Sequence, residues 1–562
     1  MIVGIDLGTT NSLIGAYLEN GPRLFPNPVG ELLTPSAISI DDDGGVIVGQ
    51  GARDRLTTHP DRSVAAFKRW MGSPRETVLG GRSLRPEQLS ALVLRSLLAD
   101  AEAATGQKVT EAIISVPAYF SDAQRTATRV AGELSGVKVE RLINEPTAAA
   151  LSYGLQERAD GGHFLVFDLG GGTLDVSIIE IFDGVVEVHA SAGDNYLGGD
   201  DFLEILMKAV FTDLKLDPSA LSLAEQAQLR RRLEQAKVNL SRDASAKIDI
   251  KVDGRDHTWS IDEMRFEQLA APLIQRMRAP LERTLRDANL VPGKLDEVVL
   301  VGGASRMPLV ARTVSRLLGR LPLRHVNPDQ AIALGAAIAS GMKARNAKLE
   351  EVILTDVCPY TLGTDVVKRD SSGGFHVGYL LPIIQRNSAV PVSRENEIWP
   401  VTDDQTQLEI NIFQGENPVA AKNVKLGSLM VPLPPGNDRT ERGVIVRFTY
   451  DINGILQVDV TVKATGEKHA LILEQNPGVL SKDEIRERLA ALAHLKVHPR
   501  EAQENLALIA RAERLYEEQL SDRDHLQSML LDFKGCLESQ DERLITRTRR
   551  QFTDAMNAVE RA

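Results

Sequence analysis

Two segments far apart in the chain carry the residue types that bind phosphate. VGIDLGTTNS (3–12) and VFDLGGGTLDVS (166–177) each contain an apolar run that ends in Asp, followed by Leu, Gly and a turn rich in Gly and Thr. Glycine lets backbone N–H groups approach an anion closely, and threonine hydroxyls add hydrogen-bond donors. Two such turns that face each other could hold a polyphosphate from both sides. The common phosphate loop, GxxxxGK[ST], is absent from the sequence.

The aspartates that close the two apolar runs, Asp6 and Asp168, suggest a metal ion. A carboxylate beside a phosphate is repelled unless a cation lies between them, so we expect a Mg²⁺ ion with its waters there. Either turn alone is also typical of an ordinary connection after a strand. The occurrence of two copies with matched Asp residues favours phosphate binding.

A third segment, VLVGGASRMP (299–308), runs from an apolar stretch into Gly302 and Gly303, then Ser305 and Arg306. A glycine turn of this kind can pack against a planar base and its sugar. By itself the signal is weak, because a strand, two glycines and a helix are also plain architecture.

The elements that must position these turns alternate between short apolar runs and amphipathic stretches, the pattern of an α/β domain. Expected strands cover 1–4, 112–115, 164–167, 176–181 and 297–301, and expected helices cover 86–104, 224–240 and 266–288. This region is too long for one ordinary core, so we expect two lobes with a cleft between them.

The sequence pattern changes after the α/β region. Between 351 and 476, apolar alternation broken by Gly, Pro and Asn predicts a compact antiparallel β domain. From the helix-start signal SKDE (481–484) onward, the sequence predicts an amphipathic helical tail. We therefore expect an α/β domain at 1–346, a linker at 347–357, a β domain at 358–478 and helices at 479–562. The apolar strip at 349–357 is either the first strand of the β domain or a linker that docks differently in different states.

Composition excludes several classes of protein. The 562 residues are 25% charged and 43% hydrophobic, close to the average of soluble globular proteins, and carry a net charge of −12. That sign argues against nucleic acid as the main partner. Cys358 and Cys536 flank no metal-binding spacing, and the N-terminus has no basic segment before an apolar core. We expect a cytoplasmic protein with reduced cysteines and without membrane insertion.

Seven ordered motifs together resemble the seventy-kilodalton heat-shock chaperones, the DnaK family. They are GIDLGTTNS, VPAYF (116–120), NEPTAAALSYG (144–154), DLGGGTLDVS, GDNYLGGDDF (193–202), VGGASRMP and NPDQAIALGAA (327–337). The similarity continues through PYTLGTD, FQGE and DINGIL to about residue 490. It implies an actin-like, duplicated ribonuclease H-like two-lobed ATPase domain, an antiparallel β-sandwich that binds peptides, and a short α-helical lid. The short tail and altered linker suggest the divergent HscC-type branch.

The resemblance assigns the site residue by residue. It implies Mg²⁺ held by Asp6 and Asp168 through water, and a Lys68 that orients the attacking water and stabilises charge on the transferred phosphoryl group. The implied catalytic residues are Lys68, Glu145, Asp168, Thr173 and Asp175. The implied ATP-binding residues are Asp6, Gly8, Thr9, Thr10, Asn11, Gly170, Gly171, Gly172, Glu234, Lys237, Ser241, Gly302, Gly303, Ser305, Arg306 and Asp329. Without the resemblance, Glu234, Lys237 and Ser241 would be read as a charged helix face.

For the β domain the resemblance implies a cleft that holds an extended apolar peptide. The matching residues are Leu362, Val367, Ile398, Val401, Leu408 and Ile410, which would otherwise be read as sandwich core. Leu408 stands where many relatives have the smaller Val, so our hypothesis is a shallower pocket that binds Leu-centred peptides weakly.

Regulation by partners follows from the same resemblance. Arg141 and Asp356 match positions that receive a J-domain cochaperone, although both could be ordinary surface charges. The exchange factor is left open. Thr355 interrupts a linker that is Leu-rich in relatives, which predicts weaker coupling between domains, and the short tail predicts a shortened lid with fast peptide exchange.

The leading expectation is an ATP-dependent chaperone that binds and releases apolar segments of unfolded or client proteins, with hydrolysis biasing peptide affinity through the linker. A sugar-kinase-like enzyme or a cytoskeletal filament would share the phosphate turns but would not need the β domain. A regulator that binds ATP without hydrolysing it is the other alternative, against which Lys68, Glu145, Asp168, Thr173 and Asp175 argue.

Overall fold

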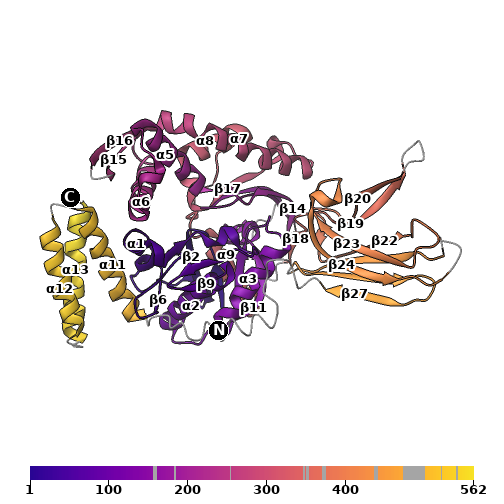
Figure 1. The fold of residues 1–562 in the computed structure, drawn as a ribbon, viewed down its shortest axis with the longest axis horizontal. Helices are drawn as coiled ribbons and strands as arrows, with labels where there is room; N and C mark the ends of the chain where they lie inside the picture. Colours follow the sequence, from indigo (N-terminus) through magenta and orange to yellow (C-terminus); the bar gives the residue numbers. More distant parts are fainter. Residues whose placement is uncertain are drawn as a thin grey trace.

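In the computed structural model, the described residues are 1–155, 161–182, 185–252, 255–323, 325–345, 349, 353–369, 375–435, 441–452, 454–472, 500–519, 522–538 and 542–561. Three parts are distinct in Figure 1: a two-lobed α/β unit in the centre, a β-rich domain at one end and three C-terminal helices at the other.

The first lobe is built on a mixed sheet with the strand order β11-β10-β1-β2-β3, and β4 pairs with β2. Its strands are β1 (Ile2–Asp6), β2 (Asn11–Leu18), β3 (Gly21–Leu24), β4 (Thr34–Pro35), β10 (Glu111–Val116) and β11 (Lys138–Asn144). β1 runs parallel to β10 and antiparallel to β2. The side chains alternate between two cores, since Ala112 and Ile114 face one while Ile113 faces the other.

Helices and a small subdomain complete this lobe. The helices are α1 (Gln50–Thr58), α2 (Pro86–Thr105) and α3 (Asp122–Ser135), and a short 3₁₀ turn covers Phe67–Trp70. α1 packs on the sheet of β5 (Ala37–Ile40), β6 (Val46–Val48) and β7 (Ser63–Ala65), and β8 (Thr77–Leu79) pairs with β9 (Arg82–Leu84). α3 follows the helix-start rule closely: Ser121 accepts from the backbone N–H of Gln124, whose side chain in turn accepts from the Ser121 N–H.

The second lobe repeats the sheet of the first. Its order is β17-β12-β13-β14-β18-β21, with β12 antiparallel to β13 and parallel to β17. The strands are β12 (Gly162–Leu169), β13 (Leu174–Phe182), β14 (Val185–Asp194), β17 (Glu297–Val301), β18 (Ile353–Val357) and β21 (Ala389–Val390). Because β1-turn-β2 and β12-turn-β13 occupy equivalent places in the two sheets, the internal similarity read from the sequence corresponds to a repeated structural unit.

The remaining helices of the α/β unit are α4 (Glu145–Ser152), α5 (Gly199–Leu214), α6 (Leu223–Asn239), α7 (Glu263–Asp287), α8 (Pro308–Leu318) and α9 (Ala331–Lys343). A hairpin of β15 (Ser245–Val252) and β16 (Arg255–Asp262) lies beside α5 and α6. α4 and α9 cross between the two sheets, and their alanine-rich faces share one core with Ile113 of the first lobe and Phe164 of the second. The lobes are therefore joined at their base.

The β domain consists of two four-stranded antiparallel sheets around a main apolar core, and Leu380, Phe413 and Ala420 form a smaller cluster beside it. One sheet contains β19 (Leu362–Arg369), β20 (Phe375–Ile384), β23 (Gln407–Gln414) and β24 (Val424–Pro432). The other contains β22 (Val392–Ile398), β25 (Val444–Tyr450), β26 (Leu456–Val462) and β27 (Lys468–Ile472). The alternation in the sequence at 407–414, 442–451 and 454–462 correctly predicted three of these strands.

The strip at 349–357 contains β18, which pairs in parallel with β14 of the second lobe at Val185, Val186 and Glu187. It also pairs in antiparallel with β21, which lies between β20 and β22 in the chain. β18 is thus docked between the second lobe and the β domain in this structure; that the strip docks differently in different states stays a prediction.

The C-terminal helices α11 (Arg500–Glu518), α12 (Arg523–Glu538) and α13 (Glu542–Arg561) form a bundle around Phe533, Phe552 and Met556. The bundle packs against the first lobe, at the end of the molecule opposite the β domain (Figure 1). The predicted helix start at 481–484 lies outside the described residues. No helix in the described part of the chain is long and apolar enough to cross a membrane.

Candidate functional site

The two Gly/Thr turns meet at the junction of the lobes. Gly171 of the turn after β12 lies so close to the turn after β1 that a Cβ atom on it would come within 1.9 Å of the Thr10 Oγ1. A Cβ on Gly172 would lie 3.0 Å from the Thr9 Cγ2. The arrangement expected from the sequence, two phosphate-type turns at one cleft, is therefore present in the structure, and it requires glycine at position 171.

Four buried carboxylates lie beneath these turns: Asp6, Glu145, Asp168 and Asp175. Asp6 accepts a hydrogen bond from the Ser115 Oγ at 2.9 Å, and Asp175 accepts one from the Tyr119 N–H at 2.9 Å. Each carboxylate sits at the end or the beginning of a strand or helix, so the paired sheets bring all four together.

Burial and mutual repulsion raise the pKa values of these groups. Burial, followed by repulsion from Glu145, raises the pKa of Asp6 to about 7 and that of Asp175 to about 7. The same causes raise the pKa of Asp168 well above its usual range. Such a concentration of negative charge needs a cation in order to stay ionised at neutral pH.

The residues fit a hydrated Mg²⁺ ion. The Oδ2 atoms of Asp168 and Asp175 are buried and have no hydrogen-bond partner in the structure. Hard carboxylate oxygens are the ligands that Mg²⁺ prefers, and the ion usually keeps several of its waters. Within the described residues, no three His, Cys, Asp or Glu side chains converge closely enough to hold a metal directly. The donors available therefore suit an ion bound through its waters.

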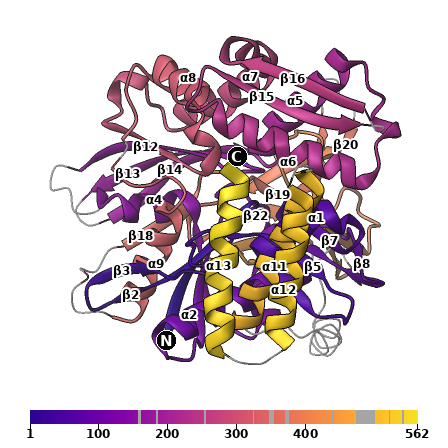
Figure 2. The ribbon, with the colours of Figure 1, turned by 90° about the vertical axis from the view of Figure 1, so that its left-hand side faces the viewer.

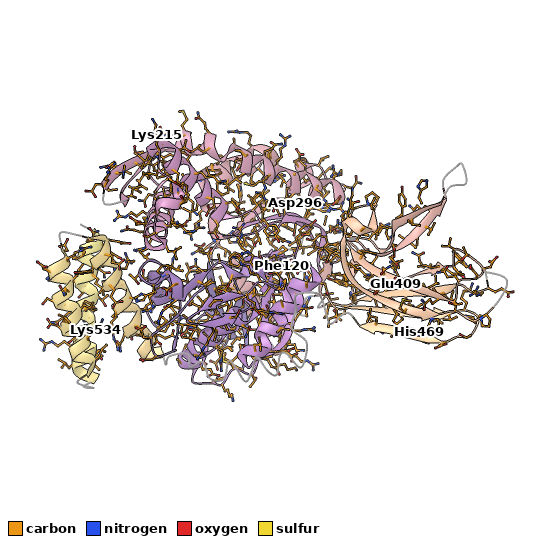
Figure 3. The ribbon with its side chains drawn as sticks, in the orientation of Figure 1. Phe120, Lys215, Asp296, Glu409, His469 and Lys534 are labelled. Atoms are coloured by element: carbon orange, nitrogen blue, oxygen red, sulfur yellow. The ribbon has the colours of Figure 1, made fainter. Side chains whose placement is uncertain are left out.

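Lys68 supplies the one buried ammonium group that faces this acidic cluster in the described chain. Its Nζ lies 3.1 Å from the Glu145 Oε1 and 5.4 Å from the centre of the ring of Phe120, which Figure 3 labels near the middle of the molecule. The Lys68 residue is only 4% exposed. The 3₁₀ turn at Phe67–Trp70 follows Ala66, whose positive φ of 57° redirects the chain. The turn thus directs Lys68 toward the carboxylates.

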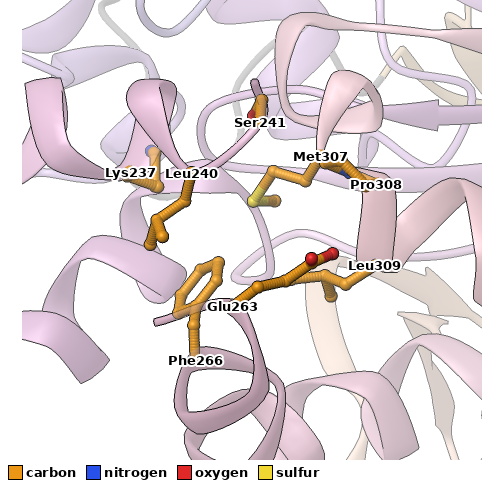
Figure 4. Close-up of a pocket in the computed structure, with 8 residues that line it drawn as sticks. All are labelled: Lys237, Leu240, Ser241, Glu263, Phe266, Met307, Pro308 and Leu309. Carbon is orange, nitrogen blue, oxygen red and sulfur yellow. The ribbon is translucent and has the colours of Figure 1, made fainter. Parts of the chain in front are cut away.

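A second region, which borders the turn after β12, contains the residues assigned to the nucleoside. The Lys237 Nζ lies 2.7 Å from the Glu234 Oε2 and donates to the Gly199 carbonyl at 2.9 Å. Arg306 pairs with Asp329 at 2.7 Å, beside the positive-φ turn at Gly302. A pocket opens between these groups (Figure 4). Its lining residues are Lys237, Leu240, Ser241, Glu263, Phe266, Met307, Pro308 and Leu309.

Several residues of this site were missed in the sequence. The apolar wall formed by Leu240, Phe266 and Met307 reads in the sequence as ordinary helix core. Arg69, next to Lys68, reaches across the cleft to Asp201 at 3.1 Å and so connects the lobes. The sequence predicted only that Ser115 ends a strand; its place beside Asp6 follows from the pairing of β1 with β10.

In the β domain, the residues matched to a peptide cleft divide into two groups. Leu362, Leu408 and Ile410 are buried in the sandwich core, and Ile398 packs against that core. Val401, in the loop after β22, is 37% exposed, and Val367 lies on β19. Leu362, Leu408 and Ile410 lie on β19 and β23 of one sheet, Ile398 ends β22 of the other sheet, and Val401 lies in a loop, so their role in a peptide cleft stays a prediction.

Arg141 and Asp356 lie close to each other at the docked linker. Asp356 is buried, accepts a hydrogen bond from the Thr147 Oγ1 at 2.7 Å and lies 3.8 Å from an Arg141 guanidinium nitrogen. In this arrangement Asp356 is not a surface charge. It ties β18 to α4, the helix that begins with Glu145.

Comparison with known proteins shows the family to which this chain belongs. The family model for the Hsp70 protein matches residues 2–79 and 75–562. The chaperone protein DnaK of Thermotoga neapolitana is 37% identical over 560 residues, covering 97% of this chain and 92% of its own length. The DnaK proteins of Thermotoga petrophila and Thermotoga maritima are each 37% identical over 573 residues, covering 99% of this chain and 93% of theirs. The chain belongs to the Hsp70 family.

Membership of this family confirms the expected class of function, an ATP-dependent chaperone with ATPase activity. It also confirms the broad fold, a two-lobed α/β unit followed by a β-rich domain. The sugar-kinase-like and filament alternatives lose their basis, because the similarity extends through the β domain and the C-terminal helices.

Proposed function

We propose that this protein binds ATP with Mg²⁺ between its two lobes and hydrolyses it to drive the binding and release of extended apolar segments of client polypeptides. The observation that carries the proposal is the contact between the two Gly/Thr turns directly above four buried carboxylates and one buried lysine. This combination places phosphate donors, a cation site and a positive charge together.

Different residues of this chain would serve different functions in hydrolysis. The turns at Gly8–Asn11 and Gly170–Thr173 would cradle the phosphates with backbone N–H groups and threonine hydroxyls. Mg²⁺, held through water by Asp6 and Asp168, would neutralise phosphate charge. Lys68, oriented by Glu145, would position the attacking water and stabilise the charge that develops on the transferred phosphoryl group. Asp175 and Thr173 border the same space and would accept or relay the water proton.

At the other end of the cleft, the nucleoside would lie in the pocket of Figure 4. Glu234, Lys237 and Ser241 lie along one side of α6 and its C-terminal end, where they would hydrogen-bond the sugar and base. Gly302, Gly303, Ser305, Arg306 and Asp329 approach from the opposite side. A base would then rest against the apolar surface of Phe266 and Met307.

The β domain would hold peptides between Val401, which is exposed, Val367, which lies on β19, and the pocket residues Leu408 and Ile410. Leu408 is 6% exposed and extends further than Val would, so we propose a shallower pocket that disfavours Leu-centred peptides. β18 would transmit the nucleotide state, since it bonds to both the second lobe and the β domain.

We further assign the domains to 1–346, 358–478 and 479–562, with the linker at 347–357, and place the protein in the cytoplasm. Thr355 in the linker and Leu408 in the pocket support a divergent, HscC-type member of the family. A J-domain cochaperone would act at Arg141 and Asp356, where it would compete with the contacts that hold β18 to α4. The C-terminal helices would form the lid once they leave the first lobe.

The proposal is tested by single-turnover ATP hydrolysis with Mg²⁺, comparing the intact protein with Lys68→Ala. Each is measured alone and with short extended peptides centred on Leu, Val or Ala. We expect slow hydrolysis that peptide accelerates. The Leu-centred peptide should accelerate hydrolysis less in this protein than it would in a protein with Val at position 408. Lys68→Ala should bind ATP but lose about 100-fold or more in hydrolysis rate, as expected for a charge-stabilising group.

Two results would contradict the proposal. If Lys68→Ala hydrolysed ATP at the wild-type rate, the assignment of the catalytic site would be wrong. If hydrolysis were normal but no peptide changed it, the coupling between the domains would be absent, and the chain would serve a different kind of partner.

A further inference from the structure

The C-terminal bundle lies over the seam where the two lobes meet. α1 belongs to the first lobe and α6 to the second, and these two helices contact each other. α11 packs along α1, so closely that a Cβ on Gly51 would lie 3.2 Å from the Ala507 Cα. Figure 2 shows α11 beside α1, with the upper end of α11 directed toward α6, and α13 on the side of the bundle further from α1.

A buried arginine fixes the bundle to the first lobe. The Arg514 side chain is 3% exposed, and its Nε lies 2.9 Å from the Asp54 Oδ1 of α1, whose own side chain is 2% exposed. Arg514 also pairs with Glu518 at 2.7 Å and with Glu560 of α13. These buried ion pairs hold the bundle on α1 in this structure.

A second contact extends the network to the other lobe. The Arg231 Nη1 of α6 donates a hydrogen bond to the Glu518 Oε1 at 2.6 Å, while the Glu518 Oε2 accepts from Arg514. Glu518 is therefore shared between α6 and α11. One continuous series of charges, Asp54, Arg514, Glu518 and Arg231, runs from the first lobe through the tail to the second lobe.

The connection reaches the proposed nucleotide site through α6. Arg231 precedes Glu234 by one helical turn on this helix, and Lys237 lies one turn further on. Glu234 and Lys237 pair with each other, and Lys237 lines the pocket at the nucleoside end. Any movement that opens the seam between α1 and α6 must separate Arg231 from a Glu518 that is fixed to α1.

We propose that the C-terminal bundle is an intramolecular brake on nucleotide release, acting as a strap that joins α1 to α6 through Arg514, Glu518 and Arg231. This inference rests on the proposed binding of ATP between the lobes. A nucleotide leaves when the lobes separate, and separation breaks the Glu518–Arg231 pair. By linkage, bound nucleotide also strengthens the attachment of the bundle.

The test is the dissociation rate of a fluorescent, slowly hydrolysed ATP analogue from the full chain, measured by displacement with excess ATP. Arg231→Gln should release it about fivefold faster than wild type, the size expected for a partly buried ion pair. Glu518→Gln should be at least as fast, and adding Arg231→Gln to Glu518→Gln should change nothing further. The matched control is Arg230→Gln, because Arg230 pairs with Glu204 inside the second lobe.

A second readout separates a strap from general loosening. Amide hydrogen exchange in α1 should slow when the analogue binds to wild type, and Arg231→Gln should remove most of that protection. Equal release rates for Arg231→Gln, Arg230→Gln and wild type would overturn the inference while leaving ATP binding intact. A wild-type protein that bound no analogue would instead overturn the proposed nucleotide site, and the brake with it.

Discussion

At the scale of single residues, the site depends on atoms that are too close for any larger side chain. Gly171 is the clearest case, because the Thr10 hydroxyl occupies the space that a Cβ would need. The contact couples the two turns, so their distance is set by this pair and not by either turn alone. The position of the Lys68 side chain is equally restricted, because it lies between Glu145 and the Phe120 ring.

We predict that Gly171→Ala weakens ATP binding by at least about tenfold, since the added methyl group must push the two turns apart. The measurement is titration of the protein with a fluorescent ATP analogue. Gly293→Ala is the control, because Gly293 lies outside both turns and no atom lies within 4 Å of a Cβ at that position. Equal affinity in both variants would show that the spacing of the turns does not control binding.

At the scale of elements, the junction between the lobes is the crossing of α4 and α9. The two helices approach so closely at Gly335 that a Cβ there would come within 1.7 Å of the Ala148 carbonyl oxygen. The same helix α9 also lies against β1, where a Cβ on Gly4 would meet the Ala336 backbone at 2.1 Å. Small residues therefore allow the backbone of this helix to touch both lobes.

Gly335→Ala is expected to destabilise the α/β unit by about 2 to 3 kcal/mol, as overpacking of a rigid backbone contact does. The measure is the midpoint of its urea-induced unfolding, followed by tryptophan fluorescence. Gly293→Ala provides the comparison, because no atom lies within 4 Å of a Cβ at that position. An unchanged midpoint for Gly335→Ala would mean that the crossing can shift without cost.

The amino-acid pattern predicted most elements, because period-two and helical alternation record which side chains are buried. It placed the strands at 112–115, 164–167 and 297–301 and the matched Asp-Gly turns correctly. It could not predict that Arg69 pairs with Asp201 or that Arg514 pairs with Asp54. The sequence around each arginine looks like that of an ordinary solvent-exposed charge. Such contacts depend on how complete domains meet, which local periodicity does not encode.

At the scale of the whole molecule, the linker joins the second lobe, helix α4 and the β domain. β18 pairs with β14 of the second lobe and with β21 of the β domain, while the Asp356 carboxylate accepts a hydrogen bond from the Thr147 hydroxyl of α4. The β domain is held further by Arg386, which pairs with Asp287 at the end of α7 and lies 3.4 Å from Glu416 of its own domain. A change at the lobe junction is therefore passed directly to the β domain.

Thr147→Val should uncouple peptide binding from hydrolysis while leaving basal ATPase activity in place. The change removes a buried hydrogen bond to a carboxylate, and the stimulation of hydrolysis by peptide should fall to about a tenth. Steady-state phosphate release with and without peptide measures this ratio. Thr128→Val, which removes a hydroxyl bonded only within α3, should keep full stimulation. Retained stimulation in Thr147→Val would show that this hydrogen bond is dispensable.

The close contact between Gly51 and Ala507 also ties together two distant parts of the gene. A larger residue at position 51 or 507 is tolerated only if the residue opposite leaves room for it. Substitutions in one segment therefore restrict the substitutions that the other segment tolerates. Recombinant chimaeras that take the first lobe from one relative and the C-terminal helices from another would bring together surfaces that were selected separately. Each half could then fold normally while the hybrid lost the communication that both parents possess.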